Sequence, residues 1–165
     1  MLPVLRFVFL YGTLKTAEQN HYLLLQKGNG VAKFIEKAVT REKFPLVVAT
    51  QYNIPFMLNK PGTGDFVTGE IFQVDERMLQ ALDRLEDVGN LYDRELMTFE
   101  TNVGCLNGTQ STKEAFVYVL NRYPKALLSL PTIPEYKNEE VKPYVSPRER
   151  QNGPTKEVLW REYSE

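Results

Sequence analysis

Residues 7–14 read Phe7-Val8-Phe9-Leu10-Tyr11-Gly12-Thr13-Leu14, an apolar run that ends at a glycine. A continuous apolar run is typical of a strand buried on both faces. Gly12 has no Cβ, so a ligand can approach the main chain closely and successive backbone N–H groups can face an anion. We expect Thr13 to cap the helix that follows, whose start adds partial positive charge. A simple turn at Gly12 explains the same residues equally well.

The whole chain has 165 residues, enough for one domain with a hydrophobic core. Its net charge of −1, from 20 basic and 21 acidic residues, provides no basic surface for nucleic acid or anionic lipid. No stretch approaches the roughly 20 apolar residues that cross a bilayer. Arg6 interrupts the N-terminal apolar run, and no small-residue cleavage site follows it. We therefore expect a cytoplasmic monomer with no nucleic-acid and no membrane partner.

The chain has one cysteine and one histidine, which limits its chemistry. Cys105 alone excludes an internal disulfide and a cysteine-based metal cluster, and its turn-rich surroundings favour a loop thiol over a nucleophile. His21 alone excludes a multi-histidine zinc site, and its leucine-rich surroundings favour a structural role over a catalytic one. We expect no metal site.

Strand signals dominate the first two-thirds of the chain, and helices are expected over about residues 17–27 and from Glu76 to about Glu86, where Asp75 is a good N-cap. Gly69 lies inside an expected strand and marks a bulge or a close approach. The expected strands are Leu5–Tyr11, Ala32–Val39, 46–48, 56–58, Phe66–Val74, Leu96–Glu100 and Ala115–Leu120. The pattern predicts one α+β domain over residues 1–150 whose strands close toward a small barrel.

The C-terminal part of the chain differs in composition from the rest. Beyond Pro131 it becomes rich in prolines and charges, and only Glu157–Tyr163 has a helical pattern. We expect the tail over residues 151–165 to wrap the surface or to be partly mobile.

Glu86 stands out because it falls on the apolar side of the second helix. Projection at about 100° per residue places Glu86 in the same arc as Leu82 and Leu85, whereas Asp83 and Asp87 lean toward water. Partial burial, the helix C-terminus and the neighbouring Asp87 charge each raise the pKa of this carboxyl. A raised pKa makes a carboxylate a better proton acceptor near neutral pH. A helix that frays early leaves Glu86 in solvent instead.

Other candidates have weaker support. Glu70 alternates within a strand and is expected to face solvent or to pair with an arginine. Tyr92 and Tyr118 lie in strand-like segments, where a tyrosine is more often a core residue, and they remain candidates for a substrate pocket. The Ile54-Pro55 bond is expected to be trans. Residues 61–64 are glycine-rich but lack a following Lys-Ser/Thr, which excludes a phosphate loop.

Several stretches in order resemble a known family. Residues 9–15, Phe-Leu-Tyr-Gly-Thr-Leu-Lys, with Asn20-His21 soon after, resemble the N-terminus of the γ-glutamylcyclotransferase-like superfamily. Residues 44–49, 53–56 and 69–79 narrow the resemblance to its γ-glutamylamine cyclotransferase branch. The resemblance covers roughly residues 4–125 and returns weakly at Tyr144–Arg150, and the tail follows it only loosely.

The resemblance implies a small mixed β-barrel with flanking helices as a domain over residues 1–150. It also implies release of 5-oxoproline from a γ-glutamyl amide such as γ-glutamyl-ε-lysine, in which the substrate's α-amine attacks its own γ-carbonyl without a cofactor or metal. The family's catalytic glutamate lies in a Leu-Asp-x-hydrophobic-Glu context and corresponds to Glu86. Its substrate loop corresponds to Tyr11, Gly12, Thr13 and Leu14.

Three other functions stay open from the sequence. The same chemistry can act on γ-glutamyl amino acids. The same fold can serve as a non-catalytic ligand-binding module, although Glu86 and the Tyr-Gly-Thr-Leu loop together argue against it. A protein that binds partners through its proline-rich tail has compositional support only.

Overall fold

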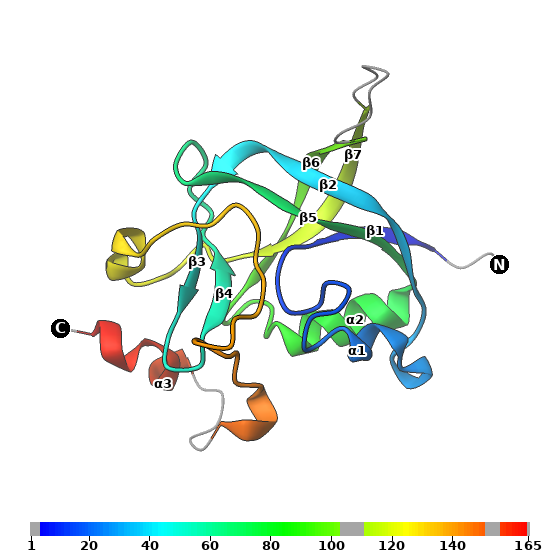
Figure 1. Cartoon of the computed structure of the whole chain (residues 1–165). Helices are drawn as coiled ribbons and strands as arrows, with labels where there is room; N and C mark the ends of the chain where they lie inside the picture. The colour runs from blue at the N-terminus through cyan, green and yellow to red at the C-terminus, as the bar shows by residue number, and fades with distance from the viewer. Residues whose placement is uncertain (1–3, 103–110, 151–155, 165) are drawn as a thin grey trace.

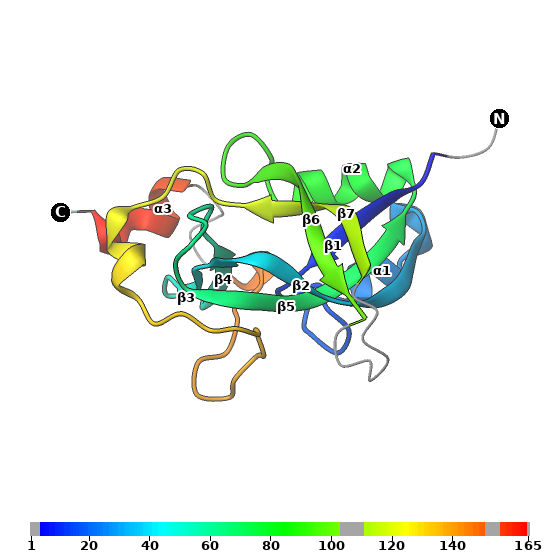
Figure 2. The ribbon, with the colours of Figure 1, turned by 90° about the horizontal axis from the view of Figure 1, so that it is seen from above.

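The computed structural model describes residues 4–102, 111–150 and 156–164. Five strands close into a barrel in the order β1-β5-β2-β6-β7 (Figures 1 and 2). β1 pairs antiparallel with β5 and parallel with β7, so the barrel is mixed and the predicted fold class is confirmed. The five are β1 (Arg6–Leu10), β2 (Ala32–Phe44), β5 (Asp65–Val74), β6 (Asp93–Thr101) and β7 (Ser111–Val119).

β2 is longer than its sequence pattern indicates, because its second half is polar. It continues past Val39 to Phe44 and pairs with β5 on one side and β6 on the other. Its register against β5 shifts between Phe34 and Glu36 and again between Val39 and Lys43. Such bulges bend a strand and increase its twist, which a small closed barrel needs.

β1 is buried on both faces, as its apolar run predicts. Phe9 faces the barrel interior, where its ring stacks on Phe99 with centroids 4.1 Å apart. Val8 and Leu10 alternate to the other face and pack in a separate cluster that includes α2 residues. Gly69 is a close approach: a Cβ there would lie 2.5 Å from the Leu10 carbonyl oxygen.

α2 (Glu76–Leu85) begins as predicted and lies along the barrel beside β1 (Figures 1 and 2). The Asp75 carboxylate caps it by accepting a hydrogen bond of 2.9 Å from the Met78 backbone N–H. Met78 and Leu82 are fully buried against the outer face of the barrel. The helix therefore has a fixed orientation, which sets the direction of the residues at its C-terminal end.

The predicted helix over residues 17–27 is wrong. The chain forms only a short α1 (Tyr22–Leu25) and a 3₁₀ turn η1 (Lys27–Asn29) there. Ala17 has a φ of 71°, which a right-handed helix does not allow. Thr13 caps no helix, because α1 begins only at Tyr22, and the Thr13 hydroxyl accepts a hydrogen bond of 2.9 Å from the Asn20 side chain. Residues 12–20 instead form a series of turns after β1.

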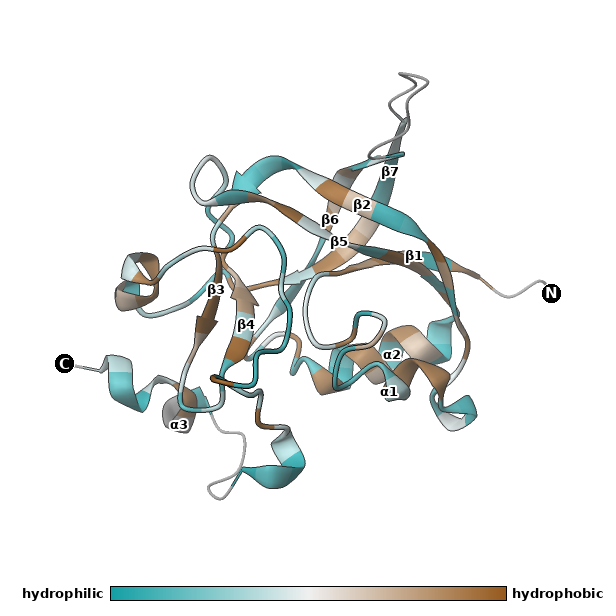
Figure 3. Cartoon of the chain, in the orientation of Figure 1, coloured by the Kyte–Doolittle hydropathy of each residue, from teal (hydrophilic) through white to brown (hydrophobic). Residues whose placement is uncertain are grey.

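A separate hairpin, β3 (Leu46–Ala49) with β4 (Ile54–Met57), packs beside the barrel. β3 is strongly hydrophobic in Figure 3, in agreement with its burial. β4 begins two residues before the predicted position because Pro55 takes part in it, opposite Val48. The Ile54–Pro55 bond is trans, since the described residues contain no cis peptide.

The C-terminal part of the chain winds around the barrel and the hairpin. It includes η2 (Lys125–Ser129), η3 (Pro147–Glu149), α3 (Lys156–Trp160) and η4 (Arg161–Tyr163). Trp160 packs on Phe56 of β4 with ring centroids 5.3 Å apart, and the Thr50 backbone N–H donates to the Tyr163 hydroxyl. A domain boundary at residue 150 stays a prediction, and Cys105 lies outside the described residues. None of the described helices is long and apolar enough to cross a bilayer.

Candidate active site

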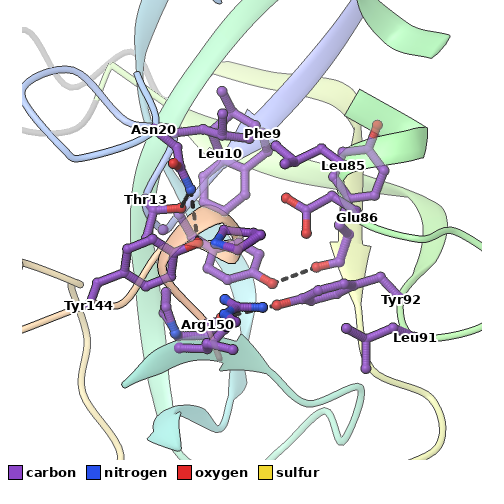
Figure 4. A pocket seen from close by; sticks show the side chains of 17 residues that line it. Phe9, Leu10, Thr13, Asn20, Leu85, Glu86, Leu91, Tyr92, Tyr144 and Arg150 are labelled. Carbon is purple, nitrogen blue, oxygen red and sulfur yellow. Dashed lines mark hydrogen bonds between the residues drawn. The ribbon is translucent and has the colours of Figure 1, made fainter. Parts of the chain in front are cut away.

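A cavity of about 80 Å³ lies where the loop after β1, the C-terminal end of α2, β7 and the segment 144–150 meet (Figure 4). Its size suits a compact ligand rather than a polymer. The residues that line it are Phe9, Leu10, Tyr11, Gly12, Thr13, Leu14, Asn20, Ile54, Pro55, Leu85, Glu86, Leu91, Tyr92, Tyr118, Tyr144, Pro147 and Arg150.

Glu86 enters the cavity from the end of α2, as the helical projection predicts. Its backbone N–H donates to the Leu82 carbonyl across 2.9 Å, and its carboxylate points into the cavity (Figure 4). Burial raises the pKa of Glu86 to about 7, while the Arg150 guanidinium acts in the opposite direction. Asp87, predicted as a second cause of the raised pKa, is exposed, so burial accounts for the rise. A carboxyl in this state can accept and return a proton near neutral pH.

The loop Tyr11–Leu14 forms another wall of the cavity. Two backbone hydrogen bonds fix it: the Lys15 N–H donates to the Gly12 carbonyl, and the Asn20 N–H donates to the Thr13 carbonyl. Within the described chain, no acceptor pairs with the backbone N–H groups of Gly12, Thr13 and Leu14. A Cβ at Gly12 would lie 3.1 Å from the Pro55 ring, so glycine also allows close packing against β4.

Tyr11 joins the loop to two strands. Its hydroxyl donates to the Tyr118 carbonyl of β7 across 2.6 Å and accepts from the Met57 N–H of β4 at 3.4 Å. Burial, and then the nearby Glu86 charge, raise the pKa of Tyr11 well above its usual range, so the phenol stays protonated. Through these two hydrogen bonds Tyr11 fixes the loop in place.

Tyr92 and Tyr118 both line the cavity, but their hydroxyls donate to protein acceptors. Tyr92 donates to the Pro55 carbonyl at 3.2 Å, and Tyr118 donates to the Asp83 carboxylate at 2.8 Å. Asp83, predicted to lean toward water, is instead half-buried and pairs with Arg94 at 2.5 Å. Burial raises the pKa of both tyrosines, so they provide walls and neutral dipoles at this site.

Glu70 and His21 do not line the cavity. The prediction that Glu70 faces solvent or pairs with an arginine is wrong, because it is 7% exposed and accepts a 2.6 Å hydrogen bond from the Thr16 N–H. Glu70 lies in the middle of β5, opposite the end of β1, and the turns of residues 12–20 place the Thr16 backbone donor beside its carboxylate. His21 is not among the lining residues, and its Nδ1 lies 3.0 Å from the Leu14 carbonyl oxygen.

Three polar lining residues were missed by sequence reasoning: Asn20, Tyr144 and Arg150. Asn20 donates to the Thr13 hydroxyl at 2.9 Å and to the Tyr144 hydroxyl at 3.0 Å, which ties the loop to the C-terminal segment. The Arg150 Nε donates to the Val145 carbonyl at 3.1 Å. Its guanidinium carbon lies 4.9 Å from the Tyr52 ring centroid and 5.9 Å from that of Tyr144.

Comparison with known proteins places this barrel and site in a family. The model of the family described as "Gamma-glutamyl cyclotransferase, AIG2-like" matches residues 8–139. The chain belongs to this family. The AIG2-like match includes the loop Tyr11–Leu14 and Glu86, and it ends before Tyr144 and Arg150. Only the weak return of the resemblance at Tyr144–Arg150 could have pointed to these two residues.

Individual AIG2-like relatives are similar over most of the chain. The chain is 48% identical over 138 residues to the Troponin C-akin-1 protein of Drosophila melanogaster, covering 84% of this chain and 80% of the relative. It is 42% identical over 132 residues to a gamma-glutamylaminecyclotransferase of Bos taurus, covering 80% of this chain and 76% of the relative. The crystal structure of an AIG2-like protein from Mus musculus superposes with a TM-score of 0.80 at 36% identity, covering 89% of this chain and 99% of that one.

Proposed function

We propose that this chain is a γ-glutamylamine cyclotransferase, which releases 5-oxoproline and a free amine from γ-glutamyl amides such as γ-glutamyl-ε-lysine. The observation that carries the proposal is a partly buried Glu86 carboxyl with a pKa of about 7, in the same cavity as the loop Tyr11–Leu14. The relatives named gamma-glutamylaminecyclotransferase, from Bos taurus and Mus musculus among others, support the same activity.

The proposed reaction begins with the substrate's α-ammonium group, which cannot attack until it loses a proton. The Glu86 carboxylate takes that proton, and the free α-amine attacks the γ-carbonyl carbon to form the new C–N bond of the ring. The bond between the γ-carbon and the leaving nitrogen then breaks. The α-nitrogen loses two protons in all and the leaving amine gains two, each carried by the Glu86 carboxyl in turn, so no water is consumed.

The protein's second task in this proposal is orientation. The nucleophile and the carbonyl belong to one molecule, so holding them in the attacking geometry supplies much of the rate acceleration. The unpaired N–H groups of Gly12, Thr13 and Leu14 are suited to hold the substrate α-carboxylate. The buried phenols of Tyr11 and Tyr92 keep that geometry rigid through bonds to the neighbouring strands.

We extend the proposal to the oligomeric state and the cellular compartment of the protein. The substrate is a small molecule, and we propose that the chain acts as a monomer in the cytoplasm, where a single cysteine needs no disulfide partner. Light scattering of the purified chain tests the monomer: a mass of one chain, 19.1 kDa, is expected, and a stable dimer contradicts it.

The test of the activity is release of 5-oxoproline from γ-glutamyl-ε-lysine, compared with a panel of γ-glutamyl amino acids. A substrate whose α-amine is acetylated is the matched control, because it keeps the amide but cannot attack it. Release from the free-amine substrate alone supports the proposal. Faster release from γ-glutamyl amino acids would mean that these are the substrates of the enzyme. No release from any compound in the panel would contradict the proposed activity and favour a non-catalytic ligand-binding module.

A further inference from the structure

Two side chains carry the charge of the cavity. Among its lining residues, all of which lie in the described ranges, Glu86 brings the one carboxyl and Arg150 the one guanidinium, and both appear in Figure 4. The others are apolar, hydroxyl or amide side chains. A partly buried site with one anion and one cation is complementary to a ligand that carries both charges close together.

Arg150 is held in place but keeps binding capacity. Its Nε is used by the Val145 carbonyl, and the guanidinium packs over the rings of Tyr52 and Tyr144. It forms no salt bridge with a carboxylate of the described residues. Arg94 of β6, by contrast, pairs with Asp83. The two terminal nitrogens of Arg150 thus have no partner among the residues that the structure describes, and they can bind a ligand.

We propose that Arg150 binds the α-carboxylate of the γ-glutamyl substrate while Glu86 takes the α-amine. The inference rests on the proposed function and deepens it, because it assigns the amino-acid head of the substrate to a charged pair in the cavity. A guanidinium presents two parallel N–H donors to a carboxylate and stays charged at every working pH.

The same assignment explains how the substrate α-carboxylate can bind close to the negatively charged Glu86 carboxylate. A carboxylate brought alone into a partly buried site beside Glu86 is repelled, and the repulsion is strong where water is excluded. Arg150 offsets that charge. A carboxylate has about four lone-pair sites, so one oxygen can accept from the Gly12–Leu14 amides and the other from Arg150. The loop and the C-terminal segment are linked through Asn20 and Tyr144, which keeps these two sets of donors at a fixed separation.

The experiment compares two ligands that differ only at the carboxylate position: 5-oxoproline and 5-oxoprolinamide, in which a neutral amide replaces the carboxylate. Their dissociation constants are measured by calorimetry or NMR titration for the wild type, Arg150→Gln and Arg150→Lys. Arg148→Gln is the matched control, since Arg148 lies in the same segment and is exposed. The wild type and Arg148→Gln are expected to prefer 5-oxoproline by roughly 10- to 100-fold. Arg150→Gln is expected to lose that preference and Arg150→Lys to keep part of it.

The ratio of the two constants separates binding from structure. A substitution of Arg150 that only loosens the fold weakens the binding of both ligands equally, so the variant keeps the preference for 5-oxoproline. That result overturns the assignment of Arg150 to the α-carboxylate. A second arm measures KM for γ-glutamyl-n-butylamine, whose leaving group has no carboxylate, and for γ-glutamyl-ε-lysine. Equal increases in Arg150→Gln support the α-carboxylate, whereas an increase for the lysine substrate alone places Arg150 at the leaving group. A wild type that binds 5-oxoproline but turns over neither substrate contradicts the proposed function and not the Arg150 assignment.

Discussion

Glu86 and Arg150 reach one cavity from two distant parts of the chain, and the guanidinium lowers the pKa of a carboxyl whose burial raises it. Burial has the larger effect, so the pKa of Glu86 is about 7. The carboxyl is thus divided between its two forms at neutral pH, where a single group can serve first as base and then as acid.

The first prediction concerns the pH dependence of kcat/KM. Glu86 must be ionised to accept the α-ammonium proton, so activity rises with pH through the pKa of the free enzyme, about 7. Below that pH, kcat/KM is expected to fall about tenfold per pH unit. Initial rates at low substrate concentration from pH 5 to 8 measure this limb. A limb centred near 4.5, the ordinary value for glutamate, contradicts the buried site.

Stability is expected to depend on pH through the same group. Because the pKa of Glu86 is raised in the folded state, that state keeps a proton between pH 4.5 and 7 that the unfolded chain has lost. The free energy of unfolding therefore decreases as pH rises across this window, by at most about 3 kcal/mol from this group. Glu86→Gln lacks the effect, so its Tm advantage over the wild type should grow from pH 5 to pH 8. A difference independent of pH argues against the raised pKa.

Asn20→Ala is expected to raise KM roughly tenfold with a smaller change in Tm. The variant removes the two donations that join Thr13 to Tyr144, and each hydrogen bond is worth about 1 kcal/mol. Asn29→Ala is the control, because Asn29 also donates two hydrogen bonds but lies in η1, outside the cavity wall. Steady-state kinetics and thermal unfolding of both variants separate the two effects. Equal KM values would mean that the link does not position the site.

Tyr11→Phe is expected to destabilise the fold. It leaves the Tyr118 carbonyl and the Met57 N–H without their partner in a buried place, at a cost of about 1–3 kcal/mol. For a chain of this size the Tm should fall by roughly 2–4 °C per kcal/mol. Tyr22→Phe, at an exposed tyrosine of α1, should leave the Tm unchanged. A similar Tm for both variants would show that the Tyr11 hydroxyl contributes nothing to the free energy of unfolding.

The elements that local pattern controls were predicted well. Asp75 caps α2, and the apolar residues of α2 repeat at helical spacing. The side of the helix on which Glu86 lies therefore follows from the sequence. The apolar run of β1 predicts burial on both faces, and Gly69 marks the close approach of β5 to β1. For α2 and β1 the residues that decide the structure are neighbours along the chain, and for Gly69 the missing side chain is itself the signal.

The elements that depend on distant contacts were not predicted. Residues 17–27 contain helix-forming residues, but the positive φ of Ala17 interrupts a helix there, and the turns before it bring the Thr16 N–H to Glu70 in the middle of β5. Tyr144 and Arg150 lie in a segment with no repeating pattern, so nothing local shows that they face Glu86. They reach the cavity only because the chain wraps around the β3–β4 hairpin after leaving the barrel.

The most direct test of the central claim is turnover by Glu86→Gln, measured as 5-oxoproline release from γ-glutamyl-ε-lysine. Asp87→Asn serves as control, since Asp87 is the next residue along the chain and is exposed. Without its base, Glu86→Gln should lose a factor of roughly 10²–10⁴ or more in kcat. It should still bind 5-oxoproline, and Asp87→Asn should turn over normally. Turnover by Glu86→Gln at nearly the wild-type rate would contradict the assignment of Glu86 as the catalytic base.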